Sequence, residues 1–311
     1  MKSAGFVALV AVVSFGCART ESPSSKPAAP APQGMPTLVL GLPLPWGTTV
    51  GLKRAQVAGA YLAKALDAHV DPRLFSYGDL AKALDAGQVD IALLPPFGYV
   101  LAAAGGRVRL VRRAKHDGVA TYRSILFVRK DSGISSLADL KGKSVAWVRE
   151  GSASGNLFPR AYLLEHHLDP ATFFSSQEVL ASHSDVCRAV FDGKVAAGAS
   201  FTDAWNDFDH ATIDGCVPAL GANVKELQIL FATDPIPNDV IAVSSRLRAG
   251  LVARLGAVLD AMSTTPEGRR ALADGFASQG FVPVADVDFD PVREALSVLR
   301  PPPTVGADAG R

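Results

Sequence analysis

Residues 144–164, SVAWVREGSASGNLFPRAYLL, change from one structural periodicity to another. The alternating apolar residues within 145–148 predict a β-strand, and those within 157–164 recur at helical spacing. Between them, residues 151–155 read Gly-Ser-Ala-Ser-Gly. A strand that passes through a short turn into a helix indicates an α/β fold.

The serine-rich turn has two interpretations on local sequence alone. Serine is a preferred N-cap, because its hydroxyl pairs an amide group that the first helical turn leaves unpaired. The same amides, the hydroxyls of Ser152 and Ser154 and the positive end of the helix dipole can also form a seat for an anion such as phosphate. The local pattern favours neither interpretation.

Strand and helix patterns alternate along the rest of the chain. Apolar runs at 37–44, 89–96 and 122–130 predict strands, and helical patterns fill 51–68 and 78–88. This order predicts an α/β protein whose mainly parallel sheets are flanked by helices and joined by right-handed crossovers.

The 311 residues leave room for two lobes of ordinary domain size. Segments 121–128 and 238–243 are the candidate crossovers between the lobes. We therefore expect one lobe from residues 37–122 plus 239–298 and the other from residues 123–238.

Residues 1–17 have the pattern of a bacterial lipoprotein signal. Lys2 is followed by an apolar region that is too short to span a bilayer, and small residues precede Cys17. This pattern predicts that Cys17 is lipidated and that the protein is extracytoplasmic and membrane-anchored. Because Ser14 stands where such signals usually carry leucine, an ordinary cleaved signal or an uncut anchor stays open.

Two segments outside the lobes have compositions that cannot form a core. Residues 18–36 are rich in Pro, Ala and Ser and have no apolar period, so we expect a disordered tether. Residues 299–311 have a similar composition and are expected to form a disordered tail.

Composition argues against a nucleic-acid partner. The chain is 48% hydrophobic with a formal net charge of +1, which is typical of a globular protein. The basic run at 107–115 lacks interleaved aromatic residues, and its alternation with apolar residues predicts a solvated strand face.

The cysteines and histidines do not indicate a metal site. The chain has neither Cys-x-x-Cys nor His-x-x-x-His, so no metal is expected. Once Cys17 is set aside, Cys187 and Cys216 remain. Their separation permits a disulfide in an exported protein, but the sequence does not decide whether it forms.

Three enzyme signatures fail on inspection. A nucleophile elbow requires serine at the centre of residues 151–155, where Ala153 stands. Residues 142–144, Gly-Lys-Ser, precede a strand instead of opening a helix and lack the earlier glycine of a P-loop. Nothing local selects a hydrolytic triad from Ser152, His183 and Asp203. We expect no catalytic residues and no cofactor.

Five segments of the chain together resemble a known family, the extracytoplasmic binding proteins of phosphonate, phosphite and phosphate ABC transporters. The resemblance is carried, in the family's order, by SYGDLAKALDAGQVDIALLPP, TYRSILFVRKDSGISSLADLKGKSVAW, GSASGNLFPRAYL, ASHSDVCRAVFDGKVAAGA and PIPNDVIAV. It implies a type II-like periplasmic binding protein with two hinge crossovers and a ligand held between the lobes.

The resemblance also implies which positions contact the ligand. The family's tyrosines, serine-rich helix start, histidine and two acidic residues match Tyr77, Tyr122, Ser152, Ala153, Ser154, His183, Asp203 and Asp239. Ala153 departs from the family's usual threonine. Asp203 is shorter than the glutamate of the aminoalkylphosphonate binders.

Each position has a chemical role that fits an oxyanion. Amides and hydroxyls donate to anionic oxygens, and a carboxylate accepts from a protonated P–OH or a ligand amine. We therefore predict a monomeric solute-binding lipoprotein that hands a small phosphorus oxyanion to an ABC permease. The alternatives are a sensor that presents the ligand to a membrane kinase and, less favoured, a two-lobed transferase or hydrolase.

Overall fold

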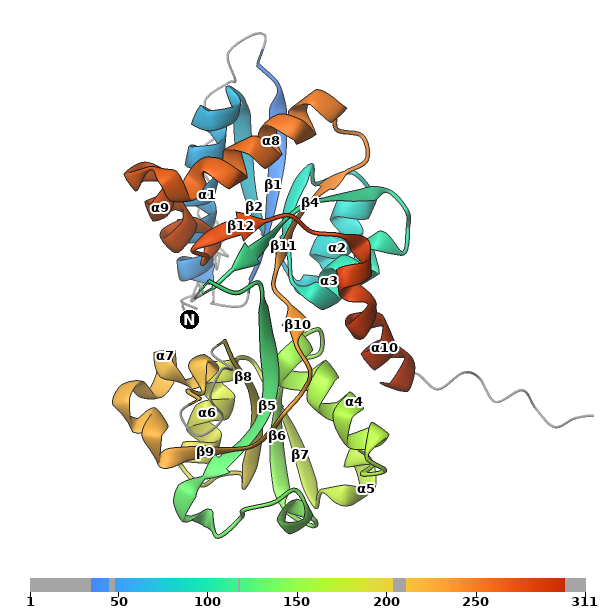
Figure 1. Cartoon of the computed structure of the whole chain (residues 1–311), viewed down its shortest axis with the longest axis vertical. Coiled ribbons are helices and arrows are strands. Elements are labelled where there is room, and N and C mark those ends of the chain that lie inside the picture. Colours follow the sequence, from blue (N-terminus) through green and yellow to red (C-terminus); the bar gives the residue numbers. More distant parts are fainter. Residues whose placement is uncertain (1–34, 45–47, 117, 204–210, 300–311) are drawn as a thin grey trace, which may run out of the picture. The chain divides into compact units, whose positions relative to one another are not determined.

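The computed structural model describes residues 35–44, 48–116, 118–203 and 211–299. Two six-stranded sheets with flanking helices make up this part of the chain (Figure 1). The predicted signal with Cys17, nearly all of the predicted tether and nearly all of the tail lie outside the described residues. Within them, no helix combines the length and apolar character needed to cross a membrane.

The first sheet has the strand order β12-β4-β11-β3-β1-β2. Strand β1 pairs in parallel with β2 and β3, whereas β11 is antiparallel to β3 and β4, and β12 is antiparallel to β4. The strands are β1 (Thr37–Pro43), β2 (His69–Phe75), β3 (Ile91–Leu94), β4 (Val108–Lys115), β11 (Val240–Ser244) and β12 (Gly280–Val282).

The second sheet has the order β10-β5-β8-β6-β7, with β9 also paired to β5. Strand β6 is parallel to β7 and β8, and β5 is antiparallel to β8, β9 and β10. The strands are β5 (Thr121–Arg129), β6 (Ser144–Val148), β7 (Ser176–Leu180), β8 (Ala197–Thr202), β9 (Leu227–Ala232) and β10 (Ile236–Pro237).

The α/β prediction is confirmed, but both sheets are mixed. The predicted parallel pairing holds for β2-β1-β3 and β7-β6-β8. Apart from the pair of β12 with β4, the antiparallel pairs involve a strand that arrives from the other sheet. Such a strand, β5 or β11, enters its sheet at the carboxyl edge and therefore runs against the strands that end there.

The chain passes between the sheets at two neighbouring places. Sheet membership changes between Lys115 and Thr121 and again between Pro237 and Val240. The two connections are bonded to each other, because the Asn238 amide donates to the Ala120 carbonyl at 3.0 Å and β10 pairs with the start of β5. The predicted boundary at residue 238 lies in the second connection, whereas residue 122 is already the second residue of β5. The division of the chain into lobes stays a prediction.

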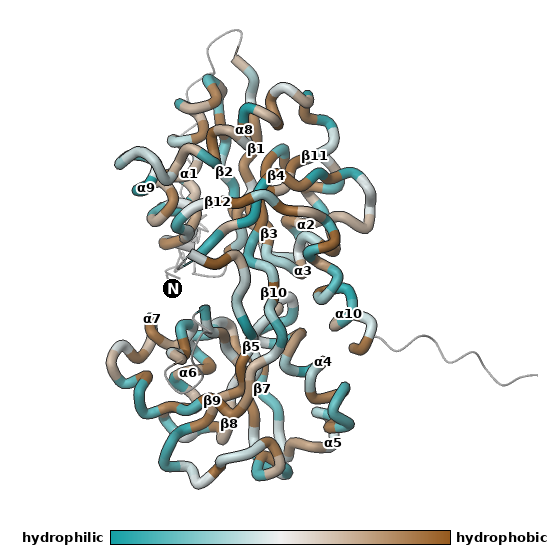
Figure 2. The backbone as a smooth tube through the Cα atoms, in the orientation of Figure 1, coloured by the Kyte–Doolittle hydropathy of each residue, from teal (hydrophilic) through white to brown (hydrophobic). Residues whose placement is uncertain are grey.

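Each sheet has apolar clusters on both faces, and helices cover them. In β1, Leu38, Leu40 and Leu42 join one cluster while Val39 faces the other, as the two-residue period of a strand requires. The outer helices alternate between hydrophilic and hydrophobic residues (Figure 2). They are α1 (Thr48–Leu66), α2 (Tyr77–Asp85), α3 (Pro96–Ala103), α4 (Phe158–Glu165), α5 (Pro170–Phe173), α6 (His183–Phe191), α7 (Val217–Leu220), α8 (Ala249–Ala261), α9 (Pro266–Ala271) and α10 (Asp290–Leu299).

One of these clusters contains residues that follow strands of both sheets. Ala153 and Phe158, which follow β6 of the second sheet, are buried together with Leu80 and Leu94 of the first. Helix α10 contributes Val292 to the same cluster. The helix start that follows β6 is thus packed against the first sheet's elements.

The basic run does not form the predicted solvated face. Strand β4 holds these arginines at partly buried positions, and ion pairs link Arg112 to Asp260 at 2.7 Å and Arg113 to Asp288 at 3.4 Å. The expectation was wrong because helices that come much later in the chain supply carboxylates to this strand.

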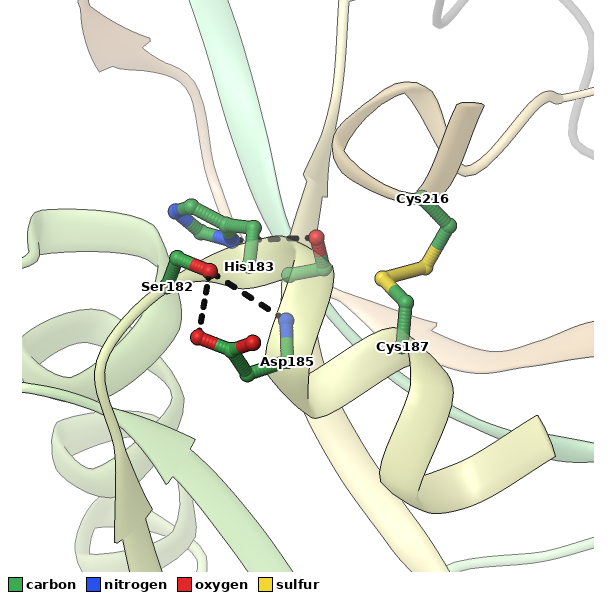
Figure 3. The surroundings of a disulfide bond; sticks show 6 residues. Ser182, His183, Asp185, Cys187 and Cys216 are labelled. Atoms are coloured by element: carbon green, nitrogen blue, oxygen red, sulfur yellow. Dashed lines mark hydrogen bonds between the residues drawn. A yellow bond between two sulfur atoms is a disulfide. The ribbon is translucent and has the colours of Figure 1, made fainter. Parts of the chain in front are cut away.

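Cys187 and Cys216 form a disulfide, which the sequence left open (Figure 3). Cys187 lies in α6, and Cys216 ends the 3₁₀ turn Asp214–Cys216. Their Cα atoms are 5.3 Å apart, and both residues are fully buried in the core of the second sheet.

Replacing both cysteines, Cys187→Ala and Cys216→Ala, should lower the free energy of unfolding by about 3 kcal/mol, because the bond limits the unfolded chain. The bond links positions 29 residues apart. Denaturant unfolding of the parent in reductant should match the variant, and the variant itself should not respond to reductant. Equal stability of the oxidised parent and the variant would contradict the prediction.

Candidate functional site

The candidate site is a cavity of about 320 Å³ at the carboxyl ends of both sheets. The first sheet contributes Pro43, the last residue of β1, and Pro95 after β3, and the second contributes Gly151 after β6 and Asp203 after β8. Ligand sites of α/β proteins characteristically lie outside the carboxyl ends of strands. The fold therefore concentrates loop ends and helix starts from both sheets around one cavity.

All of the positions that the sequence singled out line this cavity, and they come from both sheets: Tyr77, Tyr122, Ser152, Ala153, Ser154, His183, Asp203 and Asp239. Their convergence is a fact of the structure. Their role in ligand binding stays a prediction.

The serine-rich turn is in part a helix cap. The Ser152 hydroxyl oxygen accepts from the Gly155 amide at 3.1 Å, and this opens the π-helical turn η3 (Ala153–Leu157) that leads into α4. Ser154 has no such capping role. Its carbonyl accepts from the Ser124 hydroxyl at 2.6 Å. Both serine side chains also border the cavity, so the two interpretations do not exclude each other.

The two glycines of the turn answer separate steric requirements. Gly151 has φ +92°, a left-handed conformation that side chains rarely adopt. At Gly155 a Cβ atom would lie 2.3 Å from Cγ2 of Val148, so only glycine lets the turn return against its own strand. These requirements explain why glycine flanks the serines.

Two helix starts with the same local design aim their first residue at the cavity. Tyr77 begins α2 behind the cap Ser76, and His183 begins α6 behind the cap Ser182. In each case the cap accepts from the backbone amide of an aspartate three residues on and donates to its carboxylate. The two sheets thus present a tyrosine and a histidine by the same means.

Burial shifts the ionisation of the cavity groups. Burial and the neighbouring Asp203 carboxylate raise the pKa of Asp239 to about 7. Burial lowers the pKa of His183 to about 4, so this ring is neutral at neutral pH. Burial and the charge of Asp239 also raise the pKa of Tyr77 and Tyr122, which therefore keep their phenol protons.

Several cavity residues escaped the sequence analysis. The Phe201 ring lies edge-on to His183 at 5.0 Å and to Tyr122 at 6.0 Å, between two predicted positions. His116 and Asn238 line the cavity from the crossovers, and Phe276 and Ala277 form an apolar wall. Only Asn238, next to Asp239, carried a local signal.

The described residues contain no group of three or more histidine, cysteine, aspartate or glutamate side chains placed to hold a metal ion. The cavity offers hydroxyl, amide and imidazole donors on one hand and two carboxylates on the other. Among its described lining residues there is no lysine or arginine. This chemistry suits a small ligand that accepts at several oxygens and donates at one or two points.

Two α/β lobes that share a polar cavity at their carboxyl edges define a solute-binding protein of the periplasmic type. The chain belongs to the family described as ABC transporter, phosphonate, periplasmic substrate-binding protein, whose model matches residues 46–289. The predicted resemblance and the predicted fold class are confirmed. Membership implies an extracytoplasmic protein that binds a substrate for an ABC transporter.

Individual relatives agree with this assignment. The chain is 27% identical to the phosphate-import protein PhnD of Mycolicibacterium smegmatis over 316 aligned positions, which cover 96% of this chain and 95% of that protein. The structure of Prochlorococcus marinus PhnD1 with methylphosphonate is 18% identical, has a TM-score of 0.71 and aligns over 85% of this chain and 98% of its own. A phosphonate-transporter binding protein from Pseudomonas aeruginosa is 19% identical, with a TM-score of 0.69 over 84% and 86% of the chains.

The raised pKa of Asp239 predicts a pH dependence of stability. Between its ordinary value of 3.8 and about 7, the folded protein holds a proton that the unfolded chain releases, so the free energy of unfolding falls as pH rises through this window. Asp239→Asn should remove this fall. Without ligand, the variant should have a higher free energy of unfolding than the parent at about pH 8. Denaturant unfolding should show this difference shrinking toward about pH 5.

His183 supplies the control, because its pKa shift acts in the opposite direction. Between about 4 and 6.5 the unfolded chain binds a proton that folded His183 does not, so stability rises with pH there. His183→Gln should therefore gain stability relative to the parent at about pH 5 and lose that gain at about pH 7.5. If both variants had the parent's pH profile, the two ionisation assignments would be wrong.

Proposed function

We propose that this protein captures a small phosphorus oxyanion, namely phosphate, phosphite or a small alkylphosphonate, and delivers it to an ABC permease. It acts as a monomer, makes no chemical change in the ligand, and is tethered to the membrane by lipid on Cys17. The observation that carries the ligand class is the convergence of the predicted positions from both sheets on one cavity.

The donor set supports an oxyanion as the ligand. The hydroxyls of Ser154, Tyr77 and Tyr122 and the amides at the start of η3 can each donate to an anionic oxygen. Neutral His183 can donate as well without adding a charge. A small anion can thus be surrounded by fixed dipoles instead of by cations.

The two carboxylates favour phosphorus over sulfur. Asp203 and Asp239 are acceptors, and a fully deprotonated tetrahedral anion would face them with further acceptors. A ligand with a P–OH group donates to Asp203, whereas Asp239, whose raised pKa favours its protonated form, can donate to an oxygen of any of these anions. Sulfate has no such proton at neutral pH, so the acids discriminate against it.

The relatives support the same ligand class. One is named for phosphate import and another holds methylphosphonate. The apolar wall of Phe276 and Ala277 gives a short alkyl substituent a surface to contact.

Calorimetric titration should show binding of at least one of phosphate, phosphite and methylphosphonate, and at least about a hundredfold weaker binding of sulfate. That ratio corresponds to about 3 kcal/mol, the scale of one hydrogen bond between a ligand P–OH group and a carboxylate. In the same titrations Ser154→Ala should weaken binding by about tenfold to a hundredfold, because it removes a donor to a charged oxygen.

Thr265→Ala is a control for the loss of a hydroxyl outside the cavity. Thr265 caps α9 by accepting from the Gly268 amide at 3.0 Å, and it does not line the cavity. Its loss should lower ligand-free stability by about 1 kcal/mol and leave affinity unchanged. Binding of sulfate as tight as that of the phosphorus ligands, or parent-like affinity in Ser154→Ala, would contradict the proposed ligand chemistry.

The lipid anchor has its own test. Cys17→Ser should move the protein from the membrane fraction to the soluble fraction and remove the mass of its acyl groups, of which several are needed for stable anchoring. Ser14→Leu restores the usual residue of such signals and should stay in the membrane fraction. An unchanged mass and fractionation in Cys17→Ser would overturn the lipoprotein proposal.

A further inference from the structure

The short 3₁₀ turn Asp214–Cys216 contacts the end of β8, two side chains of β8 and helix α6. No residue of the turn itself lines the cavity. Its first residue holds the end of β8. The Asp214 carboxylate accepts from the backbone amide of Asp203 at 2.8 Å and from the Thr202 hydroxyl at 3.2 Å. Asp214 therefore fixes the backbone from which the Asp203 side chain extends to the cavity.

The second residue of the turn, Gly215, makes room for two side chains of β8. A Cβ atom there would lie 2.2 Å from the Ser200 hydroxyl oxygen and 2.8 Å from a ring carbon of Phe201. The Ser200 hydroxyl is bonded to Nδ1 of His183 at 3.0 Å, and the Phe201 ring packs against His183. The space that glycine leaves is thus occupied by the groups that orient the histidine.

The third residue, Cys216, is covalently joined to α6. Its partner Cys187 lies one helical turn beyond His183, the first residue of that helix (Figure 3). The disulfide therefore restrains the helical turn that begins at His183. The hydrogen bond to Ser200 and the packing of Phe201 restrain the His183 ring itself.

We propose that Asp214, Gly215 and Cys216 are positioning residues that set ligand affinity by holding Asp203 and His183 in place. The proposal rests on the proposed function for its link to affinity. None of the three touches the cavity, so they act through Asp203, Ser200, Phe201 and the disulfide. A purely structural turn would change stability and leave the affinity of the folded protein unchanged.

The proposal is tested by titrating phosphate, phosphite and methylphosphonate into three variants, at a temperature where circular dichroism shows each to be folded. Gly215→Ala, Asp214→Ala and the double cysteine variant should each bind the parent's preferred probe about tenfold to a hundredfold more weakly, as expected when positioned donors are displaced. Asp214→Asn keeps an acceptor for the Asp203 amide and should recover most of the affinity lost in Asp214→Ala.

Val190→Ala is the matched control. Val190 is fully buried in the same helix and the same core as Cys187, and its truncation lowers stability while leaving the Asp214 hydrogen bonds, Gly215 and the disulfide unchanged in sequence. It should bind like the parent. If it loses as much affinity as the turn variants, or if Gly215→Ala and Asp214→Ala both bind like the parent, the positioning role is overturned. Should Gly215→Ala fail to fold, the Asp214 pair decides.

A ligand-free readout separates this proposal from the proposed function. The imidazole ¹⁵N signals of His183, assigned by their loss in His183→Gln, report on the ring's hydrogen bond. They should shift in Gly215→Ala and in the double cysteine variant and stay in place in Val190→Ala. A parent that binds none of the probes would refute the proposed function, while unchanged His183 signals in the turn variants would refute the positioning role.

Discussion

The pairing of the two crossing segments is the constraint on which the site depends. The backbone amide of Asn238 donates a hydrogen bond to the Ala120 carbonyl, and Ile236 pairs in register with Tyr122. These contacts hold the two crossing segments side by side. Both crossings run between carboxyl edges, so they bring those edges to a common cavity and place Tyr122 and Asp239 among its lining residues. The same geometry forces β5 and β11 to run against their neighbours, which is why the sheets are mixed.

Among the described residues that line the cavity there is no lysine or arginine. A lysine or arginine at its wall would attract any small anion, whereas hydroxyls, amides and a neutral imidazole make the strength of binding depend on their placement. Under the proposed function the carboxylates add to this dependence, because they favour a ligand that carries a donor. Selectivity in such a site comes from geometry and proton position, and so it requires a rigid frame behind His183 and Asp203.

The sequence predicted what depends on local pattern. Strand and helix periods gave the α/β class, and the glycines and serines of residues 151–155 marked a turn whose cap the structure contains. The disulfide could be allowed but not decided, because it depends on the packing of α6 against a turn 29 residues further along. The arginines of β4 were misjudged for the same reason, since Asp260 and Asp288 reach them only through the tertiary fold.

Phe201 and Gly215 illustrate what local pattern cannot supply. Neither residue is distinguished by the sequence around it. Their contacts with each other and with His183 form only where β8 meets the turn Asp214–Cys216. The shared apolar cluster adds a second long-range restraint, because Ala153 and Phe158 are buried against the first sheet's Leu80 and Leu94. Separating these surfaces would expose apolar area to water, at a free-energy cost of about 25 cal/mol for each Å². The helix start that carries Ser152 and Ser154 is therefore tied to the first sheet, while His183 and Asp203 depend on the second sheet's own turn for their placement.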